Sequence, residues 1–254
     1  MTDERRPSDV AGKVLSLLTR LGDYPHGVVA SELSRGSGLP LSTAHRLLGM
    51  LVRDGYARFD PSTKKYTLGL RVFQLAQTVS HAQGFTGIAR QMLEQVSLTT
   101  REATLLAVLE GQRMLYVYSI EGPQQVRVVG EPGRTGPLHC TSLGKVLIAF
   151  SPDEQRERLL DTVPLERCGP NAITNRRTFR QEIATVRSRG FAIADEEHEA
   201  GIRATAVPVF GERDGVAALS TAAPAYRMTV DGLIELVPML QEASKSLSAV
   251  MPLA

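Results

Sequence analysis

The chain has 254 residues, of which 43% are hydrophobic and 22% are charged, a composition typical of a globular protein. Residues 1–84 contain 11 lysines and arginines against 7 acidic residues, whereas residues 85–254 contain 18 against 20. The net charge of +2 therefore divides into a basic N-terminal part and a slightly acidic remainder, which permits a polyanionic partner for the N-terminal part.

Simple features of the sequence argue against several classes of protein. The longest apolar runs fall well short of the roughly 20 residues that a membrane-spanning helix needs, so no contact with a membrane is expected. Met1–Pro7 has no apolar stretch after its charges and does not resemble a secretory signal. Two cysteines, Cys140 and Cys168, are too few for a disulfide framework, which favours a cytoplasmic location. Spacings such as CxxC and HExxH are absent, so the sequence predicts no metal site and no cofactor.

The first third of the chain begins with a pattern of three helices. Apolar residues at helical spacing over residues 10–21, stopped by Gly22, predict the first helix. A second, short helix fits residues 28–34, and the glycines of residues 35–38 predict a sharp turn after it. Pro40 suits the first turn of the third helix, because a residue there needs no backbone N–H.

The third helix has the residue types of a DNA-recognition helix. Its apolar positions form one stripe that would anchor it on its neighbours: Ala44, Leu47, Leu48, Leu51 and Val52. Its N-terminal half presents polar side chains on the opposite face, which can donate hydrogen bonds to base edges and phosphates: Ser42, Thr43, His45 and Arg46. An ordinary three-helix bundle with a polar outer face is the alternative.

A basic hairpin after this helix favours the DNA-binding interpretation. Residues 56–59 and 65–68 predict two short strands around a turn at residues 60–64, which together form the wing of a winged helix. Three basic side chains would lie where a wing contacts phosphates, and such contacts add affinity without sequence preference: Arg58, Lys64 and Lys65.

The remaining residues alternate between helical and strand patterns. Residues 70–79 predict a mostly apolar helix, and a second amphipathic helix begins at Phe85. Further helices are expected near residues 141–147, at 176–189 and through residues 233–240. Strands are expected at residues 103–110, 113–120, 125–129, 192–194, 204–210 and 216–221, the last two joined by residues 211–215. This mixture indicates an α+β domain with a mainly antiparallel sheet, large enough for its own core.

Longer motifs in the sequence resemble the IclR family of bacterial regulators. They comprise residues 39–48, 54–56 and 66–69 in the N-terminal part, and residues 137–145, 190–201 and 218–220 with Pro224 and Arg227 further on. The resemblance implies a winged helix-turn-helix domain over residues 8–68, a linker and dimerisation helix over 69–84, and a GAF-like effector-binding domain with a six-stranded sheet over 85–254. Many relatives have a polar or basic residue where Leu41 stands, so Leu41 is not assigned a role in base reading.

The resemblance also implies a pocket for a small effector. The positions that match effector contacts of the family are Val128, Ser142, Leu143, Asp195, Ala204, Ser220 and Ala222. Thr141 or Ser142 would cap a helix whose first N–H groups attract a carboxylate, and Asp195 would accept a hydrogen bond from a ligand hydroxyl. Because Leu143, Ala204 and Ala222 are apolar, we expect an organic acid larger than pyruvate, with an apolar or aromatic body.

Two other classes of function compete with an effector-controlled regulator. An enzyme is disfavoured and no catalytic residue is assigned: His139 and Cys140 would point to opposite faces of a strand, and the acidic run 195–199 lacks a recognisable ligand spacing. A ligand-independent regulator, whose larger domain only forms oligomers, remains the alternative. We expect a homodimer or tetramer on a palindromic operator, with repression as the default mode of action.

Overall fold

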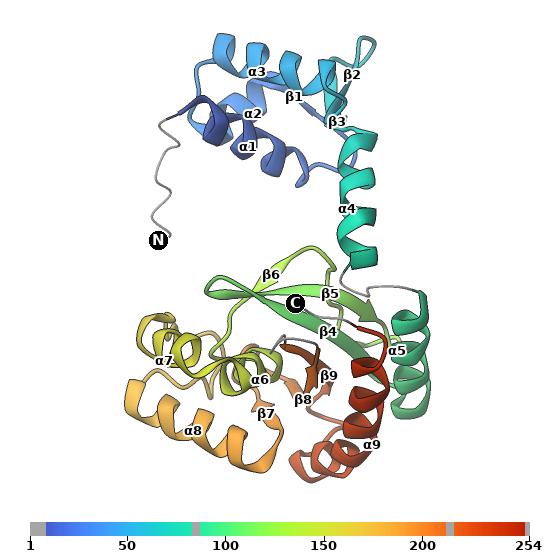
Figure 1. The fold of residues 1–254 in the computed structure, drawn as a ribbon, viewed down its shortest axis with the longest axis vertical. Helices are drawn as coiled ribbons and strands as arrows, with labels where there is room; N and C mark the ends of the chain where they lie inside the picture. Colours follow the sequence, from blue (N-terminus) through green and yellow to red (C-terminus); the bar gives the residue numbers. More distant parts are fainter. Residues whose placement is uncertain (1–8, 83–86, 212–215, 252–254) are drawn as a thin grey trace. The chain divides into compact units, whose positions relative to one another are not determined.

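The computed structural model describes residues 9–82, 87–211 and 216–251. The chain divides into two compact units, Met1–Val79 and Ser80–Ala254 (Figure 1). Among the described residues, every helix is too short or too polar to cross a membrane.

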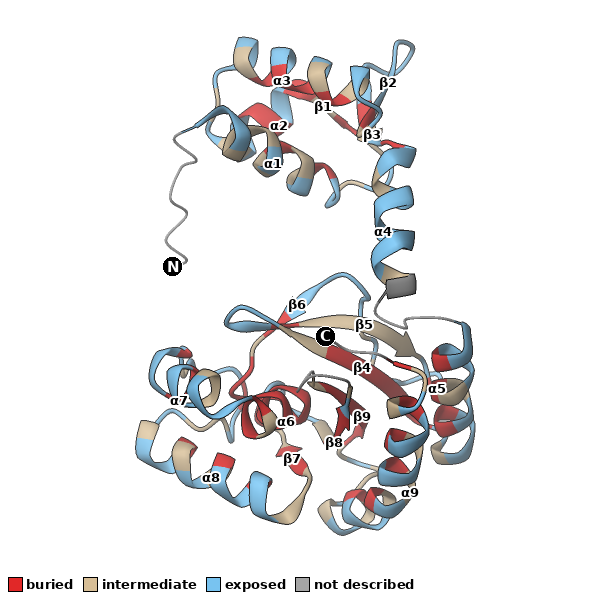
Figure 2. Cartoon of the chain, viewed as in Figure 1, coloured by how far each residue is buried: buried red, intermediate tan, exposed pale blue. Residues whose placement is uncertain are grey.

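Three helices form the body of the N-terminal unit: α1 (Val10–Leu21), α2 (Ala30–Ser37) and α3 (Leu41–Arg53). Apolar stripes on these helices meet in one buried cluster that includes Leu17, Leu33 and Leu47 (Figure 2). The predicted second helix was placed too early, because Val28–Val29 form strand β1 and the helix continues to Ser37. The turn between α2 and α3 therefore lies at residues 38–40 and not at residues 35–38, and Gly38 has a left-handed conformation with φ 64°.

The predicted wing is present as a hairpin of β2 (Ala57–Asp60) and β3 (Lys65–Leu68). It joins β1 in a three-stranded antiparallel sheet of order β1-β3-β2, with Arg58 opposite Thr67. Two glycines close the base of the hairpin. A Cβ on Gly69 would lie 2.1 Å from the carbonyl oxygen of Gly55, so only glycine fits there.

Helix α4 (Leu70–Ala82) follows the wing and confirms the predicted helix at residues 70–79. Several of its large apolar side chains are exposed: Leu70, Phe73, Leu75 and Val79. An apolar surface of this kind on a helix usually has a partner.

The C-terminal unit is built on the expected six-stranded antiparallel sheet, of order β6-β5-β4-β9-β8-β7. The strands are β4 (Ala103–Glu110), β5 (Arg113–Ile120), β6 (Thr135–Gly136), β7 (Ala192–Asp195), β8 (Ile202–Phe210) and β9 (Val216–Pro224). The prediction of a strand at residues 125–129 was wrong. These residues lie in an irregular segment, and the edge strand β6 comes later in the chain. The expected beginning of a helix at Phe85 and the loop residues 212–215 lie outside the described residues.

Helices cover both faces of this sheet (Figure 1). Helices α5 (Gly87–Thr100) and α9 (Val230–Ser248) pack on one face, and α6 (Ser142–Phe150), α7 (Asp153–Thr162) and α8 (Arg176–Arg189) lie on the other. Neighbouring residues of β4 illustrate the division, since Leu105 belongs to the core beside α6 and Leu106 to the core beneath α9. The strand residues that share a face with Leu105 are therefore those available to a site next to α6.

Candidate functional site

Helix α3 presents a polar surface on its N-terminal half. Ala44, Leu47, Leu48 and Leu51 are buried, while Ser42, His45 and Arg46 are exposed and Thr43 is half-buried. Gly49 continues this face, and a Cβ there would meet no atom within 4 Å. Within the described residues, the side chains of Ser42, His45 and Arg46 make no hydrogen bond, so their polar atoms are available to an outside partner.

The wing carries its basic residues on an ordered turn. Arg58, Lys64 and Lys65 are all exposed, and Lys64 has a left-handed backbone with φ 57°. The Asp60 carboxylate accepts hydrogen bonds from Ser62 N at 2.9 Å, Ser62 Oγ at 2.7 Å and Thr63 Oγ1 at 2.7 Å. These bonds lower the pKa of Asp60 to about 2. The turn therefore holds its shape by local contacts and leaves the lysines free to meet phosphates.

A cavity of about 610 Å³ lies between the sheet and the start of α6 in the C-terminal unit. Six of the seven residues assigned to effector binding line it: Val128, Ser142, Leu143, Ala204, Ser220 and Ala222. The sheet register explains how distant residues meet, because Ala204 lies opposite Ala222 and Ser220 lies opposite Leu105. The hydroxyl oxygens of Ser142 and Ser220 are 3.2 Å apart and form a hydrogen bond. They make a polar spot next to the apolar lining residues Leu143, Ala204 and Ala222.

The start of α6 forms the polar end of this cavity. The sequence predicted either Thr141 or Ser142 as the N-cap of this helix, and the N-cap is Thr141. Its Oγ1 accepts a hydrogen bond from Gly144 N at 3.0 Å. The first N–H groups of a helix lack intrahelical partners, and the residues that carry two of them, Ser142 and Leu143, line the cavity. The helix dipole and these N–H groups together favour a carboxylate in this position.

Asp195, which the resemblance assigns to effector binding, does not line this cavity. Among the described residues, the cavity lining includes its neighbour Ala194 but not Asp195. Successive side chains of a strand point to opposite faces, so with Ala194 toward the cavity Asp195 points away. Its Oδ1 accepts a hydrogen bond from Arg203 Nε at 2.5 Å, and Arg203 is also held by the carbonyls of Ala225 and Met228. Asp195 therefore stabilises the edge of the sheet.

Three arginines at the cavity were missed by the sequence argument: Arg113, Arg127 and Arg134. Arg113 Nε donates to Thr135 Oγ1 at 2.9 Å, and Arg127 pairs with Glu121. The irregular segment after β5 brings Arg127 and Val128 to the cavity. It is fixed there by Arg227, which donates to the carbonyl of Val126 at 2.8 Å and pairs with the buried Glu102. This placement depends on a contact between residues that are about 100 positions apart in the sequence, so no local sequence pattern predicts it.

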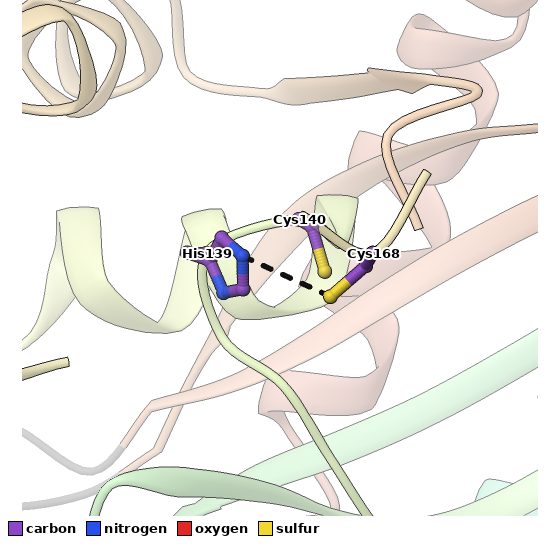
Figure 3. Close-up of side chains that lie close together, drawn as sticks. All are labelled: His139, Cys140 and Cys168. Carbon is purple, nitrogen blue, oxygen red and sulfur yellow. Dashed lines mark hydrogen bonds between the residues drawn. The ribbon is translucent and has the colours of Figure 1, made fainter. Parts of the chain in front are cut away.

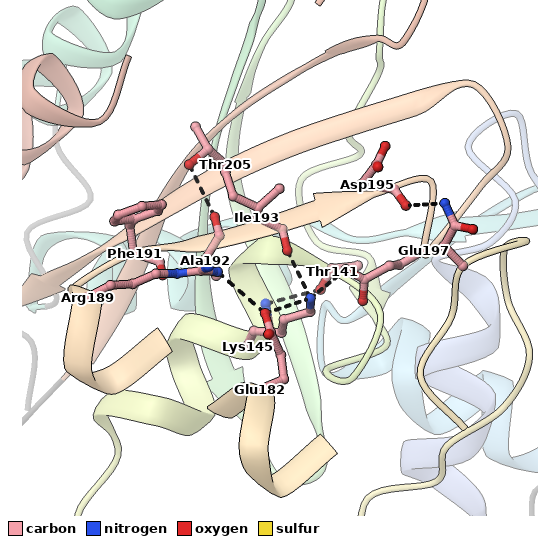
Figure 4. A network of polar contacts seen from close by, with 12 residues as sticks. Thr141, Lys145, Glu182, Arg189, Phe191, Ala192, Ile193, Asp195, Glu197 and Thr205 are labelled. Atoms are coloured by element: carbon pink, nitrogen blue, oxygen red, sulfur yellow. Dashed lines mark hydrogen bonds and ion pairs between the residues drawn. The ribbon is translucent and has the colours of Figure 1, made fainter. Parts of the chain in front are cut away.

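A buried lysine joins α6 to the elements beside it (Figure 4). Lys145 is 1% exposed, and its Nζ donates to Glu197 Oε1 at 2.5 Å, to the carbonyl of Ile193 at 2.9 Å and to Glu182 Oε1 at 3.2 Å. Burial raises the pKa of the Glu197 carboxyl above its ordinary value, although Lys145 opposes that change. The acidic run 195–199 thus supplies a structural ion pair through Glu197, while His198 and Glu199 line the cavity.

Two cysteines and a histidine lie together beneath the start of α6 (Figure 3). The argument that His139 and Cys140 point apart on a strand was wrong, because they lie in a turn just before the Thr141 cap. His139 Nε2 contacts the carbonyl of Glu166 at 2.7 Å and lies 3.9 Å from Cys168 Sγ. Burial lowers the pKa of His139 and, together with the neighbouring Cys168 thiol, raises that of Cys140.

Comparison with known proteins extends over both units. Residues 77–249 match the family model described as bacterial transcriptional regulator IclR C-terminal, and residues 10–61 match the IclR helix-turn-helix domain. The HTH-type transcriptional regulator KdgR of Escherichia coli K12 is 30% identical over 252 residues, which cover 98% of this chain and 95% of that protein. The transcriptional repressor IclR of the same organism is 26% identical over 237 residues, which cover 92% and 86%.

The fold is also similar to that of solved structures. The crystal structure of an IclR homologue from Microbacterium hydrocarbonoxydans in complex with 4-hydroxybenzoate superposes with a TM-score of 0.80 at 30% sequence identity. The match covers 93% of this chain and 98% of that one.

Proposed function

The chain belongs to the IclR family of bacterial transcriptional regulators, and on that premise we propose that it is a repressor whose operator binding is modulated by a small organic acid. The observation that carries this proposal is the cavity at the start of α6, which is lined by both apolar and polar side chains and includes the first two residues of that helix, Ser142 and Leu143. The proposed division of labour is DNA binding by residues 8–68, dimerisation through 69–84 and effector binding by 85–254.

In this proposal α3 reads operator DNA in the major groove and the wing contacts the phosphate backbone. Ser42, His45 and Arg46 are exposed on one face of α3, where an arginine can form a bidentate contact with guanine. Arg58, Lys64 and Lys65 would add electrostatic affinity that depends on salt but little on sequence. Two copies of the chain present two such surfaces to a palindromic operator.

The proposed effector is an organic acid with an apolar or aromatic body, larger than pyruvate. A cavity of about 610 Å³ falls within the usual range for small-molecule sites. Its carboxylate would lie at the start of α6, where Ser142 and Ser220 offer hydroxyls, and its body against Leu143, Ala204 and Ala222. The 4-hydroxybenzoate complex of the Microbacterium relative supports this ligand class.

Helix α4 supports the proposal of a homodimer, with a tetramer as a further possibility. Leu70, Phe73 and Val79 are at least 58% exposed, which is unusual for large apolar side chains of one helix. Pairing with the same helix of a second copy would cover them and couple the two DNA-binding heads. Effector binding would then act by changing the arrangement of the C-terminal domains, which requires different effector affinities for free and DNA-bound protein.

Calorimetry with a panel of acids tests the effector class. We expect 4-hydroxybenzoate or a related aromatic acid to bind the full chain more tightly than pyruvate and glyoxylate do. Ala204→Leu fills part of the cavity and should weaken this binding about 5- to 150-fold, since overpacking is worth about 1–3 kcal/mol. Ala249→Leu, at an exposed position after α9, is the matched control. Tight binding of pyruvate or glyoxylate alone would refute the proposed class.

The alternative of a ligand-independent regulator makes a different prediction. A ligand that binds only the folded protein raises its melting temperature by mass action. A thermal-shift screen of organic acids should therefore show stabilisation that Ala204→Leu removes. If no acid stabilises the protein while operator binding in a mobility-shift assay is intact, the C-terminal domain serves oligomerisation alone.

A further inference from the structure

The cluster of His139, Cys140 and Cys168 has no role in the function proposed above. Within the described residues, none of the three lines the effector cavity. One potential ligand atom from each side chain lies within 4.8 Å of the other two, and both cysteines are free thiols. The three side chains lie close together (Figure 3), and His139 and Cys140 are buried whereas Cys168 is exposed, so the cluster is accessible from the side of Cys168.

The donor set suits a soft or borderline metal ion. Two thiolate sulfurs and one imidazole nitrogen are typical ligands of Zn²⁺, whereas Mg²⁺ and Ca²⁺ prefer oxygen. We propose that His139, Cys140 and Cys168 bind one zinc ion, with the fourth position open on the exposed side of Cys168. This inference is independent of the proposed effector, because the two sites share no residue.

To bind zinc, the three ligand atoms need to move only slightly closer together. With Zn–S bonds of about 2.3 Å and Zn–N bonds of about 2.0–2.1 Å, a tetrahedral ion places its ligand atoms about 3.6–3.8 Å apart. His139 Nε2 and Cys168 Sγ are already 3.9 Å apart, and the other separations are no larger than 4.8 Å. A shift of about 1 Å, within the reach of the exposed Cys168 side chain, closes the site. An ion bound by Nε2 would replace the present contact with the Glu166 carbonyl.

Such an ion would tie the turn before α6, which borders the effector cavity, to the segment at Cys168, which contacts a second border of the cavity. Cys140 immediately precedes Thr141, the cap of α6, so it anchors the start of the helix. Cys168 precedes Gly169, whose N–H donates to the carbonyl of Glu197 at 2.8 Å, next to the cavity residue His198. Zinc at this position would therefore stabilise the polar end of the cavity without touching the effector.

Metal titration of the reduced, metal-free full chain tests the proposal, with Co²⁺ as a spectroscopic probe and Zn²⁺ as the competitor. The chain has only two cysteines, so a sulfur-to-cobalt charge-transfer band can arise only from Cys140 and Cys168. We expect one Co²⁺ per chain, displaced by one Zn²⁺, and a melting temperature that rises with zinc concentration. Absence of the band while both thiols are reduced would overturn the proposal.

Two variants and a control distinguish a built site from adventitious binding. Cys168→Ser alters an exposed side chain and should leave the circular dichroism spectrum unchanged, while zinc affinity falls at least about 100-fold. His139→Gln, which retains a polar partner for Glu166, should have a similar effect. His26→Gln removes an exposed histidine from the N-terminal unit and should change nothing. Equal zinc affinity in folded Cys168→Ser and wild-type protein would contradict the assignment.

Discussion

Replacement of the buried Lys145 by methionine offers a direct test of what stabilises α6. Methionine keeps most of the apolar stem of the side chain but removes the charge that faces Glu197, Glu182 and the carbonyl of Ile193. Glu197 is 8% exposed, and within the described residues its Oε2 has no hydrogen-bond partner. The carboxylate would therefore be left as an uncompensated buried charge, which costs about 3–5 kcal/mol.

For a unit of this size the loss corresponds to a fall in melting temperature of about 6–20 °C. Differential scanning calorimetry is suitable, because the two compact units can unfold in separate transitions. The chain has no tryptophan, so circular dichroism is the second probe. The double variant Lys145→Met/Glu197→Gln should be less destabilised than Lys145→Met alone, since no buried charge remains.

The loss of stability in Lys145→Met should also depend on pH. Without Lys145 the pKa of Glu197 in the folded state rises further, so the folded protein binds this proton more tightly than the unfolded chain does. Stability of Lys145→Met should therefore decrease as pH rises from acidic to neutral. Lys245→Met, in which an exposed lysine of α9 loses a surface ion pair, is the control and should lie within about 0.5 kcal/mol of wild type. Unfolding of Lys145→Met at the temperature of this control would refute the reasoning.

Three further predictions concern the N-terminal unit. Arg46→Ala should abolish discrimination between operator and random DNA in a mobility-shift assay while effector affinity stays unchanged, and retained specificity would exclude Arg46 from base reading. Replacing Lys64 and Lys65 by alanine should weaken binding to all sequences and reduce the slope of log K against log salt by about 2, because two phosphate contacts are lost. The pKa of Asp60, measured by NMR, should be about 2 and should rise in Ser62→Ala. Because the pKa in the folded state lies below the ordinary value of 3.8, the stability that this turn contributes should be lost as pH falls from about 4 toward 2.

Features that depend on local sequence were predictable. The apolar stripe of α3, the basic hairpin after it and the cap at Thr141 each rest on residues a few positions apart, so periodicity and capping rules identify them. The six-stranded antiparallel sheet was expected from the resemblance to a family, and the structure confirms it. The error at residues 28–29 was small and had a tertiary cause, because β1 exists only by pairing with β3.

The parts of the sites that depend on distant contacts were decided by the tertiary structure alone. From the sequence, Asp195 and Ala194 are equally plausible as residues that line the cavity. Only the pairing of β7 with β8 determines which of them faces it. Arg127 reaches the cavity through a segment that Arg227, just after β9, holds by a hydrogen bond to the carbonyl of Val126. Cys168 lies 28 residues after Cys140, so the two cysteines form no short motif such as CxxC, yet the fold brings them together with His139. Local sequence determined the helices, turns and caps because their interactions span one or two turns of chain. The side a strand residue faces, and which distant side chains meet, follow from sheet register and core packing, which exist only in the folded chain.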